Sequence, residues 1–190
     1  MASSFKENII GILRCKETTD ISFDVGGRIF RAHKVFVSAQ SVFFDNFFSG
    51  HEDHMKVDDL TPEVFEKVLL FLYTRAVEDC NQCEDYCGLI QAAVKYGIQN
   101  LKFICEARLY RNINSLTVLR SIEVAQQFNC AKLWQGCISY VIENMDNVVF
   151  TKKYIALMHT CPAILDSLAK ASELSERKSV HYKHKINKRI

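Results

Sequence analysis

The stretch TDISFDVGGRIFRAHKVFVSAQSVFFDNFF, residues 19–48, decides the fold of this chain. Near its start, in ISFDV (21–25), three apolar residues alternate with polar ones, and this pattern predicts a half-buried strand. Gly26 and Gly27 follow directly and predict a two-residue hairpin turn, because paired glycines supply the positive φ that such a turn needs. A second strand is therefore expected after the turn, ending near residues 32–34.

The second half of the stretch is rich in phenylalanine at helical spacing. Its apolar positions are Val35, Phe36, Ala39, Phe43, Phe44, Phe47 and Phe48. They predict a compact pair of helices. A short strand is expected near residues 55–57, and Thr61-Pro62 predicts the start of another helix, since Thr is a good N-cap and Pro fits the first turn. Upstream, residues 4–13 carry apolar side chains at helical spacing and form a candidate first helix.

From residue 85 onward the pattern is helical throughout. The predicted helices are 86–95 and 101–110, separated by Gly97, then 116–128 and 131–142, then 151–158 and 162–174. Apolar spacing ends near Glu176, so residues 176–190 are predicted to be a disordered tail. A small sheet followed by helices places the chain in the α+β class.

The composition is that of a soluble globular protein, with 48% apolar and 24% charged residues. No apolar run reaches the roughly 18 residues that a membrane span requires, and the first residues lack the apolar stretch of a secretory signal. Four of the eight cysteines, at positions 87, 105, 130 and 137, fall in apolar helical patterns, where a free thiol acts as a small hydrophobe. We therefore expect a reducing compartment, the nucleus and/or the cytoplasm, and no membrane partner.

The net charge of +2 conceals an acidic body and a basic tail. From residue 177 to residue 190 the tail contains six bases and no acid: Arg177, Lys178, Lys183, Lys185, Lys188 and Arg189. Such a tail is a solvated end, a nuclear-import signal or a contact for an anionic partner. The body has no basic stripe with interleaved aromatic residues, so binding of nucleic acid by the fold is not expected.

A short hairpin that leads into a compact, Phe-rich helical pair resembles the BTB (POZ) domain. The helices after it resemble the 3-box and BACK region that follows this domain in the speckle-type POZ and plant MATH–BTB adaptors of ubiquitin ligases. The segments that carry this second resemblance are Ile104-Cys105-Glu106, residues 119–128, residues 133–141 and Cys161-Pro162. The resemblance implies a BTB domain over residues 1–111, a helical BACK-like region over 112–175 and a tail over 176–190.

The resemblance also implies a homodimer, because family members pair through their first helix and the region around the hairpin. The corresponding dimer-interface candidates are Phe5, Ile9, Ile12, Asp20 and Lys34. The first helix has no obvious partner within the sequence, which also favours a symmetric contact. Asp20 and Lys34 match an acid–base pair at the centre of the family's dimer; alternatively, Asp20 caps or fixes a local turn and Lys34 is solvated.

Family members bind cullin-3 through the helix at residues 47–48, the loop after it, the region of Tyr73 and the 3-box. The cullin-binding candidates here are Phe47, Phe48, Glu52, Tyr73, Leu116 and Leu119. The loop departs from the family pattern: it is short, and Gly50 stands where a hydrophobic residue usually precedes the glutamate by two positions. Arg75 is a second departure, since the family often has glycine there.

Two interpretations of the function follow. The first is a substrate adaptor of a cullin-3 ubiquitin ligase with an unknown client; it is favoured by the 3-box pair. The second is a BTB assembly protein, transcriptional co-regulator or competitor of longer adaptors that does not bind cullin; it is favoured by the altered loop. Nothing in the sequence resembles the substrate-recruiting MATH domain, so the client is expected to bind the BTB–BACK surface or the tail.

Chemistry at a catalytic or metal site is the least favoured interpretation. Cys80, Cys83 and Cys87 are the one group with metal-ligand spacing, but they supply three ligands in a row where zinc takes four, usually in two short-spaced pairs. We therefore interpret them as loop and packing residues, with a zinc or redox sensor as the alternative. No Gly-x-Ser-x-Gly or His-Glu-x-x-His motif is present, and His33 is expected to be a packed, hydrogen-bonded histidine. No enzyme activity, cofactor or bound metal is predicted.

Overall fold

The computed structural model describes residues 4–50, 52–78, 83–144 and 170, and only the backbone of Lys16. The chain forms two compact units, Met1–Arg108 and Leu109–Ile190. The helices predicted at 151–158 and 162–174 lie outside the described residues, as does the tail predicted at 176–190. The domain boundary predicted at residue 111 stays a prediction.

The first helix, α1 (Phe5–Arg14), begins with a capping box. The Ser4 hydroxyl accepts a hydrogen bond from the Glu7 N–H, and the Glu7 carboxylate accepts one from the Ser4 N–H at 2.8 Å. This reciprocal pair satisfies two donors that a helix start leaves without partners. A short 3₁₀ turn, η1 (Lys16–Thr18), then leads to the sheet.

The sheet has the strand order β2-β1-β3, with β1 (Ile21–Val25) at its centre. β2 (Arg28–Ala32) pairs antiparallel with β1 across Gly26 and Gly27, whose φ angles are +57° and +82°. The predicted hairpin is confirmed, since two positive φ values in a two-residue loop match the right-handed twist of the strands. β3 (His54–Val57) pairs parallel with β1 on the other side.

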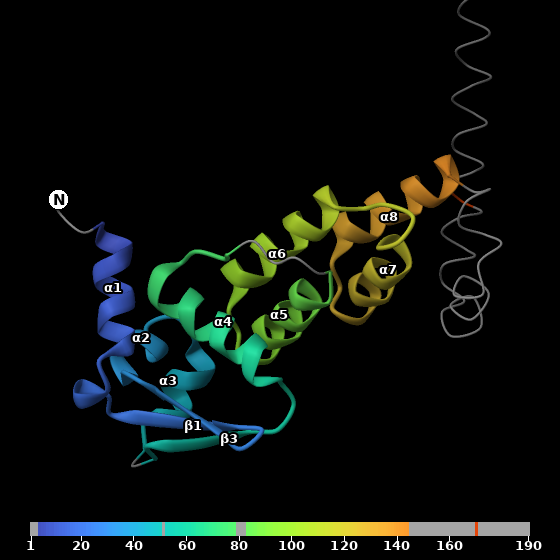
Figure 1. Cartoon of the computed structure of the whole chain (residues 1–190). Helices are drawn as coiled ribbons and strands as arrows, with labels where there is room; N and C mark the ends of the chain where they lie inside the picture. Colours follow the sequence, from blue (N-terminus) through green and yellow to red (C-terminus); the bar gives the residue numbers. More distant parts are fainter. Residues whose placement is uncertain (1–3, 51, 79–82, 145–169, 171–190) are drawn as a thin grey trace, which may run out of the picture. The chain divides into compact units, whose positions relative to one another are not determined.

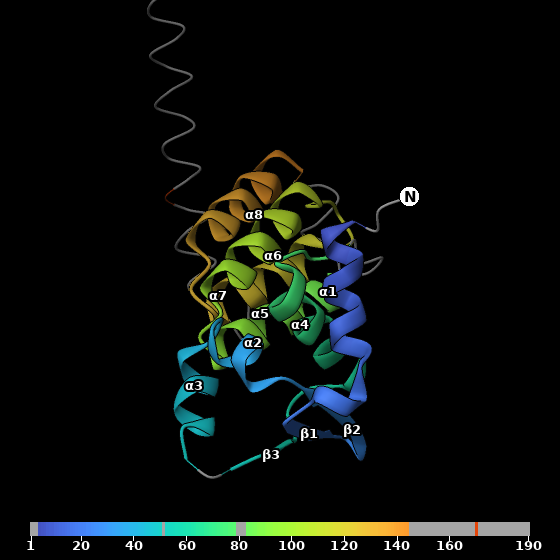
Figure 2. The same cartoon turned by 90° about the vertical axis from the view of Figure 1, so that its left-hand side faces the viewer.

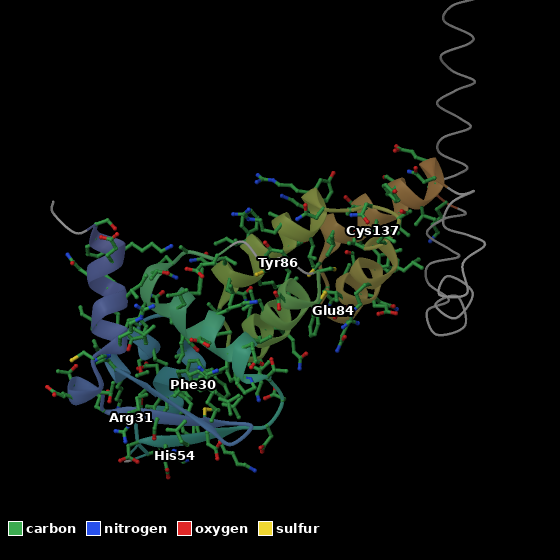
Figure 3. All side chains as sticks on the ribbon, in the orientation of Figure 1. Phe30, Arg31, His54, Glu84, Tyr86 and Cys137 are labelled. Carbon is green, nitrogen blue, oxygen red and sulfur yellow. The ribbon has the colours of Figure 1, made fainter. Side chains whose placement is uncertain are left out.

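Helices cover one face of this sheet. α2 (Lys34–Ser38), α3 (Val42–Phe48) and α4 (Pro62–Thr74) lie on the same side of the strands in both views (Figure 1, Figure 2). α2 and α3 form the helical crossover that a parallel β1–β3 pairing requires. Figure 3 shows Phe30 between the strands and the helices, whereas His54 lies on the open side of the sheet.

The centre of the first unit is a cluster of phenylalanine rings. Phe23 of β1 is fully buried, and its ring centroid lies 5.6 Å from Phe44, 5.6 Å from Phe48 and 4.9 Å from Phe65. Most of these pairs meet edge to face or tilted, the geometry that the ring quadrupole favours. The aromatic residues of α3 and α4 therefore hold both helices on the sheet.

α4 begins as the sequence predicts and ends in a left-handed residue. Thr61 accepts a hydrogen bond from the Val64 N–H, and Pro62 occupies the first turn. At the other end Arg75 has a φ of +59°, and its N–H bonds to the Phe71 carbonyl. This conformation costs an L-residue with a Cβ roughly 1–2 kcal/mol, and glycine avoids that cost. The departure from glycine at this position therefore introduces backbone strain.

Replacing Arg75 by glycine should stabilise the chain by about 0.5–1 kcal/mol, because the relief of strain exceeds the extra entropy of glycine in the unfolded state. Chemical denaturation measured at one fixed protein concentration gives the free energy of unfolding. Asn129→Gly is the matched control, and it should give a smaller gain in stability. Asn129 also has a positive φ (+52°), but asparagine tolerates this region. A destabilised Arg75→Gly variant would contradict the expectation.

Two further helices complete the first unit. α5 (Cys83–Lys95) and α6 (Gln99–Arg111) are separated by Gly97, with a φ of +66°. α6 continues to Arg111, so its last residues belong to the second unit.

The second unit contains the helix pair α7 (Val118–Gln127) and α8 (Ala131–Glu143), which pack against each other. Its buried residues include Val118, Leu119, Ile122, Val124, Leu133, Cys137 and Val141. α7 begins two residues later than the predicted helix, because the Asn114 side chain accepts hydrogen bonds from the N–H groups of Leu116 and Thr117 and forms a turn instead.

Candidate protein-interaction surfaces

A buried polar network joins the end of the hairpin to α4. The Tyr73 hydroxyl lies 2.7 Å from the backbone nitrogen of His33 and 2.7 Å from its Nδ1. The other ring nitrogen, Nε2, lies 2.8 Å from the Thr18 hydroxyl. His33 is 8% exposed, so the prediction of a packed, hydrogen-bonded histidine is confirmed.

The donors and acceptors of this network fit one arrangement. The Tyr73 oxygen accepts from the His33 N–H and donates its proton to Nδ1, which leaves Nε2 as the donor to Thr18; the Thr18 hydroxyl then donates to the Cys15 carbonyl. Burial raises the pKa of Tyr73 to about 12, against the opposing effect of the bond from the His33 N–H. Tyr73 therefore stays protonated and keeps its donor at neutral pH.

Asp20 holds the start of α2. Its Oδ1 accepts a hydrogen bond from the Lys34 N–H at 2.7 Å, while His33, the residue at the N-cap position, offers no side-chain cap. A carboxylate at a helix N-terminus is favourable because it satisfies an open N–H and faces the positive end of the helix dipole. Among the described residues no ion pair joins Asp20 to the Lys34 side chain. The local role of Asp20 is thus present, and the dimer role of both residues stays a prediction.

α1 presents part of its predicted interface to solvent. Phe5 is 81% exposed and Ile12 39% exposed, so both side chains are available to a partner. Ile9 is buried, because α1 packs against α4. The sequence interpretation that α1 lacks a partner within the chain is therefore wrong, and Ile9 supports the helix rather than forming part of its open face.

The cullin-binding candidates of the first unit divide into exposed and buried residues. Phe47 is partly exposed on α3, and Glu52 is exposed in the loop that follows. Phe48 is fully buried beneath the sheet, and Tyr73 is only 6% exposed and engaged with His33. Phe48 and Tyr73 thus pack inside the fold, where they support α3 and α4. The role of these four residues in cullin binding stays a prediction.

The loop after α3 carries no apolar side chain among its described residues: Ser49, Gly50, Glu52 and Asp53 are all exposed. An added Cβ at Gly50 meets nothing within 4 Å. A hydrophobic side chain at this position would therefore enter open space without disturbing the fold.

In the second unit, Leu116 is 88% exposed in the turn before α7, whereas Leu119 is 8% exposed and packs inside. Leu116 is thus available as an apolar contact. Leu119 faces the core of the α7–α8 pair, so the sequence spacing that grouped the two leucines does not place them on one open face.

The cysteines show no metal-ligand cluster in the part of the chain that the structure describes. Cys83 and Cys87 lie one turn apart on α5 with their sulfur atoms 3.9 Å apart, and Cys87 is buried. Cys80, the remaining member of the predicted group, lies outside the described residues. Within the same residues no helix has the length and apolar character to cross a bilayer.

Comparison with known proteins identifies both parts of the chain. The family profile of the BTB/POZ domain matches residues 11–113, more than half of the sequence. The chain belongs to the BTB/POZ family. The profile of the BPM/SPOP BACK domain matches residues 117–169, so a BACK region follows the BTB domain. The predicted resemblance to BTB/POZ proteins with a BACK region is confirmed, and so is the predicted α+β fold class.

Curated relatives match this chain over part of their own length. BTB/POZ and MATH domain-containing protein 4 of Arabidopsis thaliana is 28% identical over 84% of this chain and 38% of its own length. TD and POZ domain-containing protein 4 of Mus musculus is 27% identical over 77% of this chain and 41% of its own length. The BTB domain of zebrafish PATZ1, a solved structure, covers 56% of this chain and 91% of that chain at 24% identity and a TM-score of 0.49. This BTB–BACK chain thus spans less than half of each curated relative named.

Thr18 is the site residue that sequence reasoning missed. It lies in a 3₁₀ turn before the sheet, and its contact with His33 spans 15 positions. Neither strand alternation nor helical spacing indicates such a contact, because both report on residues within a single element.

Proposed function

We propose that this chain is a dimeric BTB–BACK adaptor that joins a client protein to cullin-3 in the nucleus and/or the cytoplasm. The observation that carries the proposal is the match of a BTB domain followed by a BPM/SPOP-type BACK domain. The BTB/POZ family consists of protein-interaction adaptors that are typically not enzymes. The exposed apolar residues of α1, α3 and the turn before α7 support the proposal as contact points for other proteins.

Dimerisation is the first requirement of the proposal. Sedimentation at micromolar concentration should give about twice the chain mass of 21.9 kDa. The double substitution Phe5→Asp and Ile12→Asp should give a monomer, because two charges would have to be buried without partners at the interface. Ile9 is left unchanged, since it is buried within the chain.

Phe103→Asp is the control for this variant, because Phe103 is 63% exposed on α6, away from α1 in the sequence. It should remain dimeric. A monomeric wild-type chain would refute the dimer, and a dimer that survives the double substitution would move the interface away from α1.

Binding to cullin-3 is the second requirement. Titration calorimetry of the full chain against the purified N-terminal domain of cullin-3 measures it directly. Gly50→Met should bind about tenfold more tightly than wild type, because burial of a methionine side chain recovers roughly 1.4 kcal/mol or more. Gly50→Gln is the control of similar length without the apolar end, and it should bind as wild type does.

The calorimetry also separates the two candidate functions. The assembly-protein function without cullin is favoured by one observation, the loop at residues 49–53 without a described apolar side chain. Binding by Gly50→Met but not by wild type would show that this chain has lost the ligase role, and it would favour the second function. Equal binding by wild type and Gly50→Met would show that the loop position does not contact cullin.

A further inference from the structure

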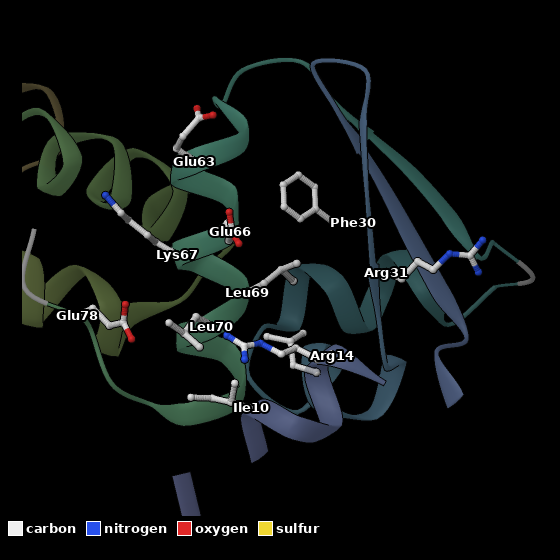
Figure 4. Close-up of a pocket in the computed structure, with 11 residues that line it drawn as sticks. Ile10, Arg14, Phe30, Arg31, Glu63, Glu66, Lys67, Leu69, Leu70 and Glu78 are labelled. Carbon is white, nitrogen blue, oxygen red and sulfur yellow. The ribbon is translucent and has the colours of Figure 1, made fainter. Parts of the chain in front are cut away.

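A groove runs beside α4 in the first unit, between this helix, α1 and β2. Its volume is about 470 Å³, within the range of binding pockets for small ligands and anchoring side chains. Apolar side chains form its floor: Ile10 and Leu13 from α1, Phe30 from β2, and Leu69 and Leu70 from α4. Figure 4 shows Ile10, Phe30, Leu69 and Leu70 around the same hollow.

This groove lies on a different flank of α1 from the predicted dimer face. The groove is lined by Ile10, Leu13 and Arg14 of α1. The exposed apolar residues proposed for dimerisation are Phe5 and Ile12. At 100° per residue these two sets point in different directions around the helix. Occupation of the groove and dimerisation through α1 can therefore be tested independently.

Charged side chains of both signs line the groove, with Glu63 and Arg14 at its two ends. Lys67, which is paired with Asp85 at 2.7 Å, and Glu78, which has an interaction of its own, also line it. Glu63 lies at the end formed by the first turn of α4, and Arg14 lies at the other end beside Leu70 and Ile10 (Figure 4). Glu63 and Arg14 are both exposed, and neither forms an ion pair among the described residues. The intervening acid, Glu66, is already paired with Arg28 at 3.3 Å. Glu63 and Arg14 thus remain available to charges of an occupant.

The spacing of these features fits a helix lying along α4. Glu63 and Leu70 are seven residues apart on α4, a rise of roughly 10.5 Å. A partner helix with charges at positions i and i+7 has the same span, and its residues i+3 and i+4 point to the same side as the charges. Apolar residues there would meet the floor of the groove, as in other helix-in-groove complexes.

We propose that the groove binds an amphipathic helix of a partner protein that carries a basic and an acidic residue seven positions apart, with apolar residues at the third and fourth positions between them. The basic residue pairs with Glu63 and the acidic residue with Arg14. The groove would then be the client site of the adaptor proposed above, so this proposal rests on that function. Its test contains no cullin, so the failure of one proposal can be told apart from the failure of the other.

The probe is a fluorescein-labelled, alanine-rich helical peptide with Lys, Leu, Leu and Glu at positions i, i+3, i+4 and i+7. Fluorescence anisotropy with the full chain measures its affinity. A Lys–Lys peptide, in which the Glu is replaced by Lys, should bind wild type about fivefold more weakly, because one exposed ion pair is lost and a repulsion is gained. A peptide with both leucines replaced by serine should not bind measurably.

Charge exchange in the protein gives the decisive comparison. Arg14→Glu should reverse the order and prefer the Lys–Lys peptide, and Glu63→Lys should prefer the corresponding Glu–Glu peptide. Both positions are exposed, and circular dichroism confirms that the variants are folded. Two variants at opposite ends keep the test valid if one of them misfolds.

Three results would overturn the proposal. The first is a dissociation constant weaker than about 1 mM for the Lys–Glu peptide. The second is a peptide preference that neither charge exchange alters. The third is binding by the Phe5→Asp, Ile12→Asp variant but not by wild type, which would show that a second copy of the chain, not a client helix, covers the groove.

Discussion

Replacing Phe23 by alanine is expected to lower the free energy of unfolding by about 3–5 kcal/mol. Phe23 is fully buried, and its ring meets those of Phe44, Phe48 and Phe65. Removal of the ring would leave a cavity bounded by β1, α3 and α4, which cannot close without moving two helices. Because small domains are stable by only about 5–15 kcal/mol, much of the stability would be lost.

Urea denaturation at a fixed protein concentration measures this loss, since self-association would make the apparent stability depend on concentration. Phe23→Leu keeps more of the volume and should lose less. Ile29→Ala on β2 is the matched control, because Ile29 is 54% exposed and should cost well under 1 kcal/mol. A loss of similar size at positions 23 and 29 would be inconsistent with a core centred on Phe23.

Replacing Tyr73 by phenylalanine should cost about 2–4 kcal/mol with almost no change in volume. The hydroxyl is the partner of both the His33 N–H and Nδ1, and each buried polar group left without a partner costs roughly 1–3 kcal/mol. Tyr110→Phe is the control, because Tyr110 is 51% exposed and its hydroxyl has access to water. Equal stability of the two variants would show that the network contributes nothing to the fold.

The same network predicts a response to alkaline pH. The folded-state pKa of Tyr73 is about 12, above its ordinary value of 10.0, so the folded state holds this proton more tightly than the unfolded state does. Its contribution to stability is therefore complete below pH 10 and is lost as the pH rises from 10 to 12. Tyr73→Phe lacks this contribution, so its stability should fall less steeply than that of wild type across this interval.

Local sequence signals predicted the hairpin and the helix starts correctly. Gly26 and Gly27 have the positive φ values that their pairing indicates, and Thr61 caps α4 as predicted. These features depend on a few neighbouring residues and on backbone geometry. Arg75 is an exception to this local rule. The end of α4 keeps the left-handed conformation although the residue there is not glycine, so residue type alone does not indicate it.

Features that depend on contacts between elements were not predictable in the same way. The sequence alone gives no reason why α1 should pack against α4, or why Asp20 should cap a helix that starts 14 positions later. Phe47 and Phe48 are adjacent phenylalanines, yet only Phe48 is fully buried, because the direction of α3 over the sheet decides which ring turns inward. Candidate contact residues chosen by spacing therefore include some that never reach the surface.

The position of β1 between two unlike partners affects how the chain assembles during synthesis. Its antiparallel pairing with β2 closes across two residues, and hairpins of this kind form in microseconds. Its parallel pairing with β3 is possible only after the chain up to Val57 has been synthesised, and the ring of Phe65 follows later still. A nascent chain that has emerged only to α3 thus exposes an unpaired strand edge and several aromatic side chains. We expect this interval on the ribosome, rather than the finished protein, to be the stage at which the chain depends most on chaperones.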